Sequence, residues 1–166
     1  MESQTGFLSV SPSNVRFVIA EVRGNLLEAE ADAIVNAVNT VGVMGKGIAL
    51  AFKRAYPKNH AEYHAACARG ELEVGRLLIH ETGLEVPRYV INLPTKRHWR
   101  SRSRLADVVA GIAALREALV SLDVRSVAVP ALGCGNGGLS WSEVGPAPHA
   151  GLADLPDVDI RLYLPN

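Results

Sequence analysis

This chain of 166 residues has few cysteines and few aromatic residues, and neither positive nor negative charge is in excess. The two cysteines, Cys67 and Cys134, are too few for a disulfide framework, and neither lies in a metal-binding spacing such as CxxC. No apolar run approaches the ~20 residues of a membrane span, and residues 1–14 lack the basic and apolar regions of a signal peptide. These absences favour a soluble cytoplasmic protein without a metal or redox cofactor.

Charge and hydrophobic content set two further limits. The 17 basic residues balance the 17 acidic ones, so any surface that attracts nucleic acid must be local. A hydrophobic content of 48% is enough for the core of one ordinary domain. Residues 1–14 are small, polar and aperiodic, and we expect them to form a flexible arm before a single domain at 15–166.

Short apolar runs alternate with helical patterns along the chain. The expected strands are 15–22, 33–38, 75–80, 88–93, 126–132 and 159–164, and the expected helices are 47–56, 60–70, 103–122 and part of 141–155. This alternation predicts an α/β architecture with helices on both faces of a mixed sheet. In such sheets ligands bind beyond the carboxyl ends of the strands.

The stretch NAVNTVGVMGKGIALAF, residues 36–52, follows one of these strands. Gly42, Gly45 and Gly47 remove side chains where the next helix begins, so backbone N–H groups can approach a phosphate with the helix dipole behind them. The spacing around Lys46 does not match GxxxxGK[ST], which argues against a P-loop. A phosphate-binding loop and a simple glycine-rich turn both remain open for this stretch.

A second glycine-rich loop, GCGNGG at 133–138, follows the strand expected at 126–132. It satisfies GxGxxG, but too few residues follow Gly138 for a dinucleotide-binding Rossmann domain. Such a turn still admits a diphosphate. The carboxamides of Asn36 and Asn39 suit sugar hydroxyls, or they cap the turn; we expect Asn39 to face a ligand and leave both alternatives open for Asn36.

The segment INLPTKRHWRSRSR, residues 91–104, holds the one basic cluster. Its cations surround Trp99, and they are Lys96, Arg97, His98, Arg100, Arg102 and Arg104. Cations interleaved with an aromatic ring suit single-stranded nucleic acid, although a solvated loop is the alternative. If all four arginines contacted phosphates, affinity would fall roughly 50-fold between 50 and 200 mM salt.

Other titratable residues give weaker signals. His60 and His64 have an i, i+4 spacing without the acid of HExxH, and a surface helix face explains them better than zinc. Cys134 lies beside glycines, but no base for a thiol nucleophile can be identified.

Three segments carry a family likeness in the expected order: residues 24–57, INLPTKRHW at 91–99 and VPALGCGNGGLSW at 129–141. Together they resemble the macrodomain family and, within it, the DarG antitoxins of DarT/DarG toxin–antitoxin systems. The resemblance implies a three-layer αβα sandwich that binds ADP-ribose as ligand or product and needs no cofactor. It further implies a hydrolase that removes ADP-ribose from thymidine in single-stranded DNA, a DNA-repair activity that reverses a DarT-type toxin.

The resemblance also implies roles for individual residues. Lys96 and Asn39 would be catalytic. ADP-ribose would contact Asn25, Leu26, Asn36, Asn39, Val43, Met44, Gly45, Lys46, Gly47, Ile48, Thr95, Leu132, Gly133, Cys134, Gly135, Asn136, Gly137 and Gly138. DNA would contact Arg97, His98, Trp99, Arg100 and Arg102. The toxin would bind mainly through a further domain absent from this chain, and we expect a monomer.

Two departures from the family pattern affect the expected chemistry. Asn25 stands where many macrodomains have aspartate, and Gly137 stands where the related human enzyme that acts on protein carboxylates has its aspartate. A lysine–aspartate mechanism therefore does not transfer. Lys96 would act either as a neutral nucleophile, helped by Arg97 or Arg100, or as a cation that stabilises the departing thymine. The competing functions are an ADP-ribose reader and a hydrolase of protein-linked ADP-ribose.

Overall fold

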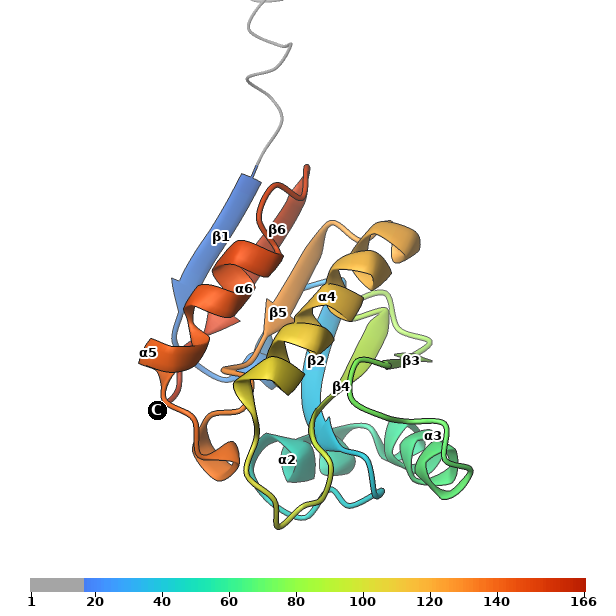
Figure 1. Ribbon diagram of the computed structural model, residues 1–166. Coiled ribbons are helices and arrows are strands. Elements are labelled where there is room, and N and C mark those ends of the chain that lie inside the picture. The colour runs from blue at the N-terminus through green and yellow to red at the C-terminus, as the bar shows by residue number, and fades with distance from the viewer. Residues whose placement is uncertain (1–16) are drawn as a thin grey trace, which may run out of the picture.

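The computed structural model describes residues 17–166, in which six strands form one sheet (Figure 1). The strands are β1 (Phe17–Val22), β2 (Ala33–Asn39), β3 (Leu78–Glu81), β4 (Tyr89–Lys96), β5 (Ser126–Val129) and β6 (Val158–Tyr163). Their order is β1-β6-β5-β2-β4-β3, and every neighbouring pair is parallel except β3–β4. The expected arm at 1–14, and the first two residues of the strand expected at 15–22, lie outside the described residues.

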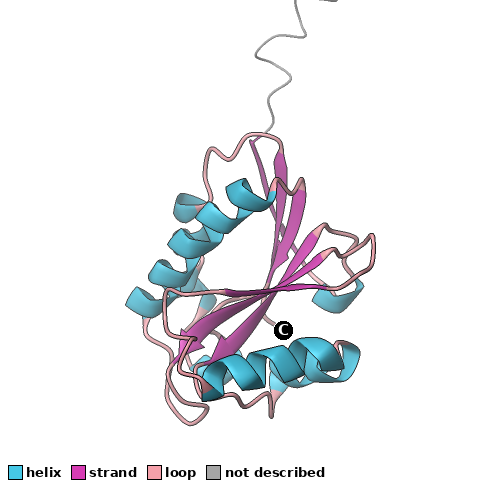
Figure 2. Cartoon of the chain, turned by 90° about the vertical axis from the view of Figure 1, so that its right-hand side faces the viewer, coloured by secondary structure: helices cyan, strands magenta, loops and turns pink. Residues whose placement is uncertain are grey.

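Helices cover both faces of the sheet (Figure 2). Those described are α2 (Gly47–Ala55), α3 (Pro57–Ala68), α4 (Leu105–Leu122), α5 (Trp141–Val144) and α6 (Pro146–Gly151), with the short 3₁₀ turns η2 (Leu26–Glu28) and η3 (Gly135–Gly137). Helices α2 and α3 contact each other on one face, and α4, α5 and α6 form the other layer. The prediction of a three-layer αβα sandwich around a mixed sheet is confirmed.

Prolines account for the main differences at element ends. Pro57 separates α2 from α3 and is itself the first residue of α3, so that helix starts three residues before the expected position. Pro146 likewise begins α6. Proline suits the first helical turn because its missing N–H would have no partner there. Strand β4 runs through Pro94 to Lys96, three residues farther than the apolar pattern predicts.

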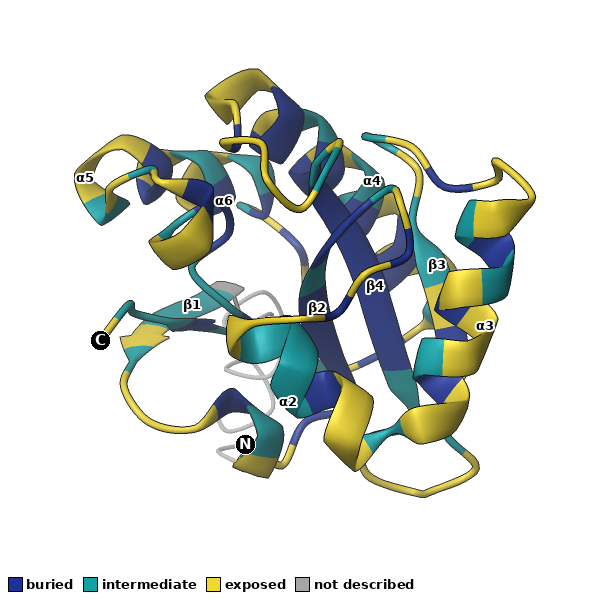
Figure 3. Cartoon of the chain, turned by 90° about the horizontal axis from the view of Figure 1, so that it is seen from below, coloured by how far each residue is buried: buried dark blue, intermediate teal, exposed yellow. Residues whose placement is uncertain are grey.

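The sheet separates a large hydrophobic cluster on one face from two smaller ones on the other, the second of which includes Met44 and Tyr63. The large cluster lies under α4 and α6 and includes Ile91, Leu115 and Ile160, whereas the first of the smaller ones, under α2 and α3, includes Ile34 and Phe52. Strands β2 and β4 are therefore buried on both faces, as central parallel strands require (Figure 3). This burial fixes the positions at which their carboxyl ends emerge.

Strands β2, β4 and β5 run in the same direction, so the loops that follow them emerge together at the carboxyl ends of the strands. The loop after β2 leads into α2, the loop after β4 leads into α4, and the loop after β5 leads into η3. We call them the first glycine loop (residues 40–46), the basic loop (97–104) and the second glycine loop (133–138). The fold thus brings together three segments that are far apart in the sequence (Figure 1).

Candidate functional site

A cavity of about 1020 Å³ opens among the three loops. Its volume lies at the upper end of the range for small-molecule sites. The turn at Asn25–Leu27 and the last residues, Tyr163–Asn166, complete its wall. Tyr163–Asn166 are not among the site residues expected from the sequence, although a final strand parallel to β5 must also end on this side of the sheet.

Most of the candidate ligand-binding residues line this cavity. They are Asn25, Leu26, Asn39, Val43, Gly45, Lys46, Gly47, Ile48, Thr95, Gly133, Cys134, Gly135, Asn136 and Gly137, together with Lys96 and Trp99. Asn36, Met44, Leu132 and Gly138 are not part of the lining, nor are Arg97, His98, Arg100 and Arg102.

Asn36, for which the sequence left a ligand contact and a structural role open, is fully buried in β2 and is not part of the cavity lining. Its Nδ2 donates a hydrogen bond of 3.2 Å to Oδ1 of Asn92, which also accepts one from Asn59. The Nδ2 group is thereby paired, as buried polar groups usually are, whereas Oδ1 of Asn36 has no hydrogen-bond partner among the described residues. Asn36 therefore belongs to the support beneath the cavity and not to its wall.

Asn39 lies at the end of β2 and holds the first glycine loop in place. Its Oδ1 accepts hydrogen bonds from the Tyr63 hydroxyl at 2.8 Å, from Val41 N–H at 3.1 Å and from Val43 N–H at 3.3 Å. Its Nδ2 donates to the Val43 carbonyl at 2.8 Å. Only the second hydrogen of that amide is left for a ligand. Asn39 thus shapes the loop in addition to facing the cavity.

The first glycine loop ends at Lys46, the N-cap residue of α2, whose side chain forms no capping hydrogen bond. The first turn of a helix has unpaired N–H groups and a positive dipole end, which together favour an anion. Gly47 has φ +55°, and a Cβ added there would lie 3.0 Å from Nδ2 of Asn136. The two glycine loops therefore approach each other closely at this point.

The second glycine loop packs against the basic loop. The N–H of Ser103 donates to the Gly137 carbonyl at 2.9 Å, and a Cβ on Gly137 would lie 2.4 Å from Oγ of Ser103. Ser103 occupies the space that any side chain at position 137 would need. An aspartate at position 137, which the sequence lacks, would therefore clash with Ser103.

Lys96 is the last residue of β4, and its Nζ donates a hydrogen bond of 3.1 Å to the Trp99 carbonyl. Burial lowers the pKa of the Lys96 ammonium, and the charge of Lys46 lowers it further. The expectation that Arg97 or Arg100 would exert this effect is wrong: Arg97 pairs instead with Asp107 at 3.3 Å, and the contributing cation is Lys46.

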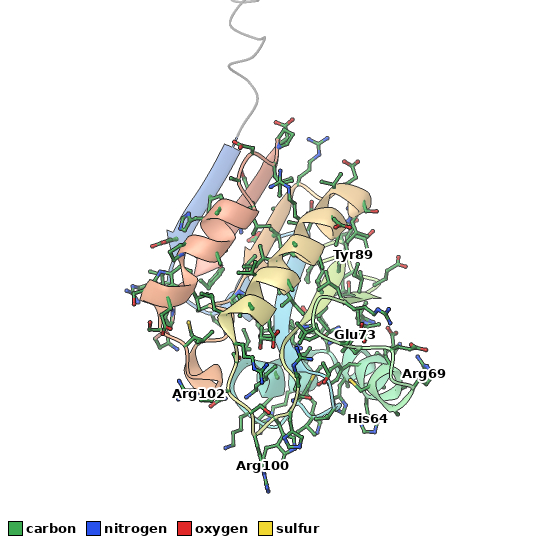
Figure 4. All side chains as sticks on the ribbon, in the orientation of Figure 1. His64, Arg69, Glu73, Tyr89, Arg100 and Arg102 are labelled. Carbon is green, nitrogen blue, oxygen red and sulfur yellow. The ribbon has the colours of Figure 1, made fainter. Side chains whose placement is uncertain are left out.

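Trp99 lines the cavity and is 40% exposed. The guanidinium of Arg100 lies 4.5 Å from the centroid of its indole ring, and the His98 ring stacks with it at 5.2 Å. Arg102 donates to the Gly138 carbonyl at 2.9 Å. Figure 4 shows Arg100 projecting from the tip of the molecule, whereas Arg102 lies nearer its body. Arg97 and Arg102 therefore have polar partners within the chain, and Arg100 contacts the ring of Trp99.

The ionisable side chains of the lining have little capacity for acid catalysis. Within residues 17–166, the lining contains the cations Lys46 and Lys96 and no aspartate or glutamate. Burial raises the pKa of the Cys134 thiol, and Glu143 raises it further, so this cysteine is not an activated nucleophile. The cavity is thus suited to a ligand with negative charge near two lysines.

Two other kinds of feature are absent from the described part of the chain. No group of three or more His, Cys, Asp or Glu side chains is arranged to hold a metal ion there. None of the described helices combines the length and the apolar character that crossing a membrane requires.

Comparisons with known proteins identify relatives of this chain. The DNA ADP-ribosyl glycohydrolase of Thermus aquaticus is 51% identical over 145 residues, which cover 87% of this chain and 40% of that protein. The macrodomain of Mycobacterium tuberculosis DarG superposes with a TM-score of 0.88 at 48% identity, covering 90% of this chain and 99% of that one.

Thermosipho africanus DarTG, solved in complex with ADP-ribose, matches with a TM-score of 0.81 at 32% identity, over 90% of this chain and 43% of that one. The chain thus spans about 40% of the length of the curated relative from Thermus aquaticus. The Macro domain family matches residues 35–147. This chain belongs to the macrodomain family, in which it is similar to the macrodomains of DarG proteins.

Proposed function

We propose that this domain is a DNA ADP-ribosyl glycohydrolase that removes ADP-ribose from thymidine in single-stranded DNA and so reverses a DarT-type toxin. The observation that carries the proposal is the position of Lys96, which lines the cavity between the two glycine loops and bonds to the backbone of the exposed Trp99. A ligand site, a reactive amine and a basic aromatic loop thereby share one cavity.

The shape of the cavity suits ADP-ribose. Its diphosphate would lie at the start of α2, between the glycine loops, where Lys46 and unpaired N–H groups face it. The adenine end would lie near Asn25 and Leu26, and the distal ribose near Asn39. In the T. africanus DarTG structure the matched protein holds this ligand, which supports the assignment.

Lys96 would act at the anomeric carbon that joins ADP-ribose to thymine. As a cation, it would stabilise the negative charge that develops on the departing base, a role that requires no change in pKa. As a nucleophile it must first be neutral. Its burial and Lys46 lower its pKa toward that state, whereas the diphosphate of a bound ligand would oppose them.

The single strand would approach along the basic loop. Trp99 offers an exposed ring beside the cavity, and Arg100 projects outward from it. Arg97, His98 and Arg102 would complete this surface, although Arg97 also pairs with Asp107 of α4 and Arg102 also bonds to Gly138. The binding of bases by aromatic rings and of phosphates by arginines is typical of single-strand binding.

The toxin is proposed on the basis of a relative. A curated T. africanus protein, 33% identical over 160 residues, is named a DNA ADP-ribosyl transferase–DNA ADP-ribosyl glycohydrolase fusion protein. A transferase and a glycohydrolase joined in one chain support opposed activities on the same DNA. For this protein we propose a DarT-type partner in the cytoplasm, contacted mainly outside this domain, which itself acts as a monomer.

The test is cleavage of a single-stranded oligonucleotide bearing ADP-ribosyl thymidine, with free ADP-ribose and restored oligonucleotide measured together. The native protein should release both products, and Lys96→Ala should lose about 10³-fold in rate while it still binds ADP-ribose. Lys96→Arg separates the two roles of Lys96, because arginine keeps the positive charge but cannot serve as a neutral amine. Full activity of that variant would exclude the role of nucleophile. Tight binding without release by the native protein would instead identify a reader.

A further inference from the structure

The end of β4 is joined to the first glycine loop by one side chain that the proposed reaction does not use. Thr40 follows β2 directly, and its hydroxyl donates a hydrogen bond of 2.7 Å to the carbonyl of Arg97, the residue after Lys96. Strands β2 and β4 are neighbours, and Asn39 pairs with Lys96 in their register. The bond thus extends the contact between the two strands one residue past their ends.

The register of the two strands explains why this bond is needed. Val38 pairs with Pro94 but Asn39 pairs with Lys96, so an irregularity passes over Thr95. A bulge at a strand end re-aims the side chains that follow it. The backbone ladder alone therefore does not fix the direction of the chain after Lys96.

After β4 ends, the basic loop folds back over Lys96, the last residue of that strand. The Lys96 ammonium donates to the Trp99 carbonyl, three residues later. The segment from Arg97 to Trp99 is therefore the wall against which the amine rests. Among the hydrogen bonds found in residues 17–166, that of Thr40 is the one that ties this segment to the first glycine loop.

We infer that Thr40 is a positioning residue for Lys96: its hydroxyl fixes the distance between the first glycine loop and the amine. Thr40 does not line the cavity, so it acts through Lys96 and not on the ligand. The inference rests on the proposed function, in which the first glycine loop holds the diphosphate while Lys96 acts at the anomeric carbon. A rigid link between them places the amine relative to the bound ligand.

The expected consequence is a loss of rate without a loss of binding. A misplacement of about 1 Å in a reacting group costs up to roughly 100-fold in rate. The first glycine loop keeps its own support from Asn39, so its affinity for ADP-ribose does not depend on Thr40.

The experiment compares Thr40→Val, which keeps the shape and removes the hydroxyl, with Thr40→Ser, which keeps the hydroxyl. We expect Thr40→Val to lower kcat on the ADP-ribosylated oligonucleotide by about 10- to 100-fold, with the Kd for ADP-ribose within about twofold of the native value. Thr40→Ser should recover most of kcat. A kcat of Thr40→Val within twofold of native, or a Kd that rises in step with the loss of kcat, overturns the inference.

A matched control is Thr82→Val, which removes a hydroxyl bond to the Pro87 carbonyl in the turn between β3 and β4, at the opposite end of the sheet. It should lose a similar small amount of stability and keep native kcat. A lower kcat in this control would show that stability, and not position, limits the rate, and would count against the inference.

A second measurement does not depend on cleavage. The rate at which a small acylating reagent modifies Lys96, followed by peptide mass spectrometry, should change at least about twofold in Thr40→Val, because the amine loses its fixed surroundings. An unchanged rate overturns the inference. If the native protein fails to cleave, the proposed function fails, but this measurement still decides whether Thr40 positions Lys96.

Discussion

The two glycine loops and the basic loop emerge at the same edge of one sheet, yet they are built in opposite ways. In the glycine loops the backbone forms the site, and neighbouring side chains such as Ser103 and Asn136 come too close for a Cβ to be added freely. In the basic loop the side chains present the site: Trp99 is 40% exposed, and Arg100, which lies over its ring, projects outward (Figure 4). We therefore expect the glycine loops, where an added side chain would clash, to tolerate substitution less well than the exposed side chains of the basic loop.

The largest effect should come from adding a methyl group to the second glycine loop. Gly137→Ala would place a Cβ 2.4 Å from Oγ of Ser103, whose own N–H is bonded to the Gly137 carbonyl. We expect the free energy of unfolding to fall by about 1–3 kcal/mol, the usual cost of overpacking, as measured by urea denaturation. Affinity for ADP-ribose should fall with it.

A compensating change tests the cause of that loss. In the double variant Ser103→Gly/Gly137→Ala the Cβ gains the space that Ser103 occupied, so more than half of the lost stability should return. If the double variant is as unstable as the sum of the two single variants, the packing argument is wrong and the glycine is needed for another reason.

The next effect concerns the salt dependence of single-strand binding. Because Arg97 is paired with Asp107 and Arg102 with the Gly138 carbonyl, Arg100 and Arg104 remain as the main phosphate contacts. Two contacts predict that affinity for an unmodified oligonucleotide falls about sevenfold between 50 and 200 mM salt, in place of the roughly 50-fold expected for four. Titration by fluorescence anisotropy at several salt concentrations measures this slope.

The control for the salt experiment is Arg88→Gln, because Arg88 precedes β4 at the other end of that strand. It should leave the slope unchanged, whereas Arg100→Gln/Arg104→Gln should nearly abolish it. A slope near that of four contacts in the native protein would mean that Arg97 and Arg102 exchange their internal partners for phosphate.

The smallest effect is on stability as a function of pH. The pKa of Lys96 is lower in the folded chain than the ordinary value of 10.5. Between those two pKa values the unfolded chain binds more protons, so this lysine destabilises the fold at neutral pH and ceases to do so as pH rises toward 10.5. Relative to Lys96→Met, the native protein should therefore gain stability, measured as Tm, as the pH rises from neutral toward 10.5. A Tm difference that does not vary with pH would contradict this assignment.

Much of the architecture was predictable because it depends on local pattern. Alternating apolar runs and helical periodicity predicted the strands and helices, and the topology of parallel strands placed both glycine loops at one edge. Lys96 ends β4 and Trp99 lies three residues farther, so both fall on the cavity at the carboxyl end of that strand. Proline shifted only the ends of elements.

The parts that could not be predicted depend on contacts between distant residues. Asn36 and Asn39 have the same chemistry and lie three residues apart, and only the fold shows that Asn36 turns toward Asn92 in the core. The pairing of Arg97 with Asp107 depends on the path of the basic loop. The influence of Lys46 on Lys96 arises between the start of α2 and the end of β4, which are 50 residues apart in the chain.

The pairing of β1 with β6 has a practical consequence for handling this protein. The parallel register carries the chain past Tyr163 to the cavity, where the N–H of Leu164 donates to the Val22 carbonyl at 2.9 Å and Asn166 forms part of the wall. A purification tag or fluorescent protein fused after Asn166 would begin beside the cavity, whereas one fused ahead of β1 would be attached at the opposite end of the strands. Binding assays should use the amino-terminal fusion.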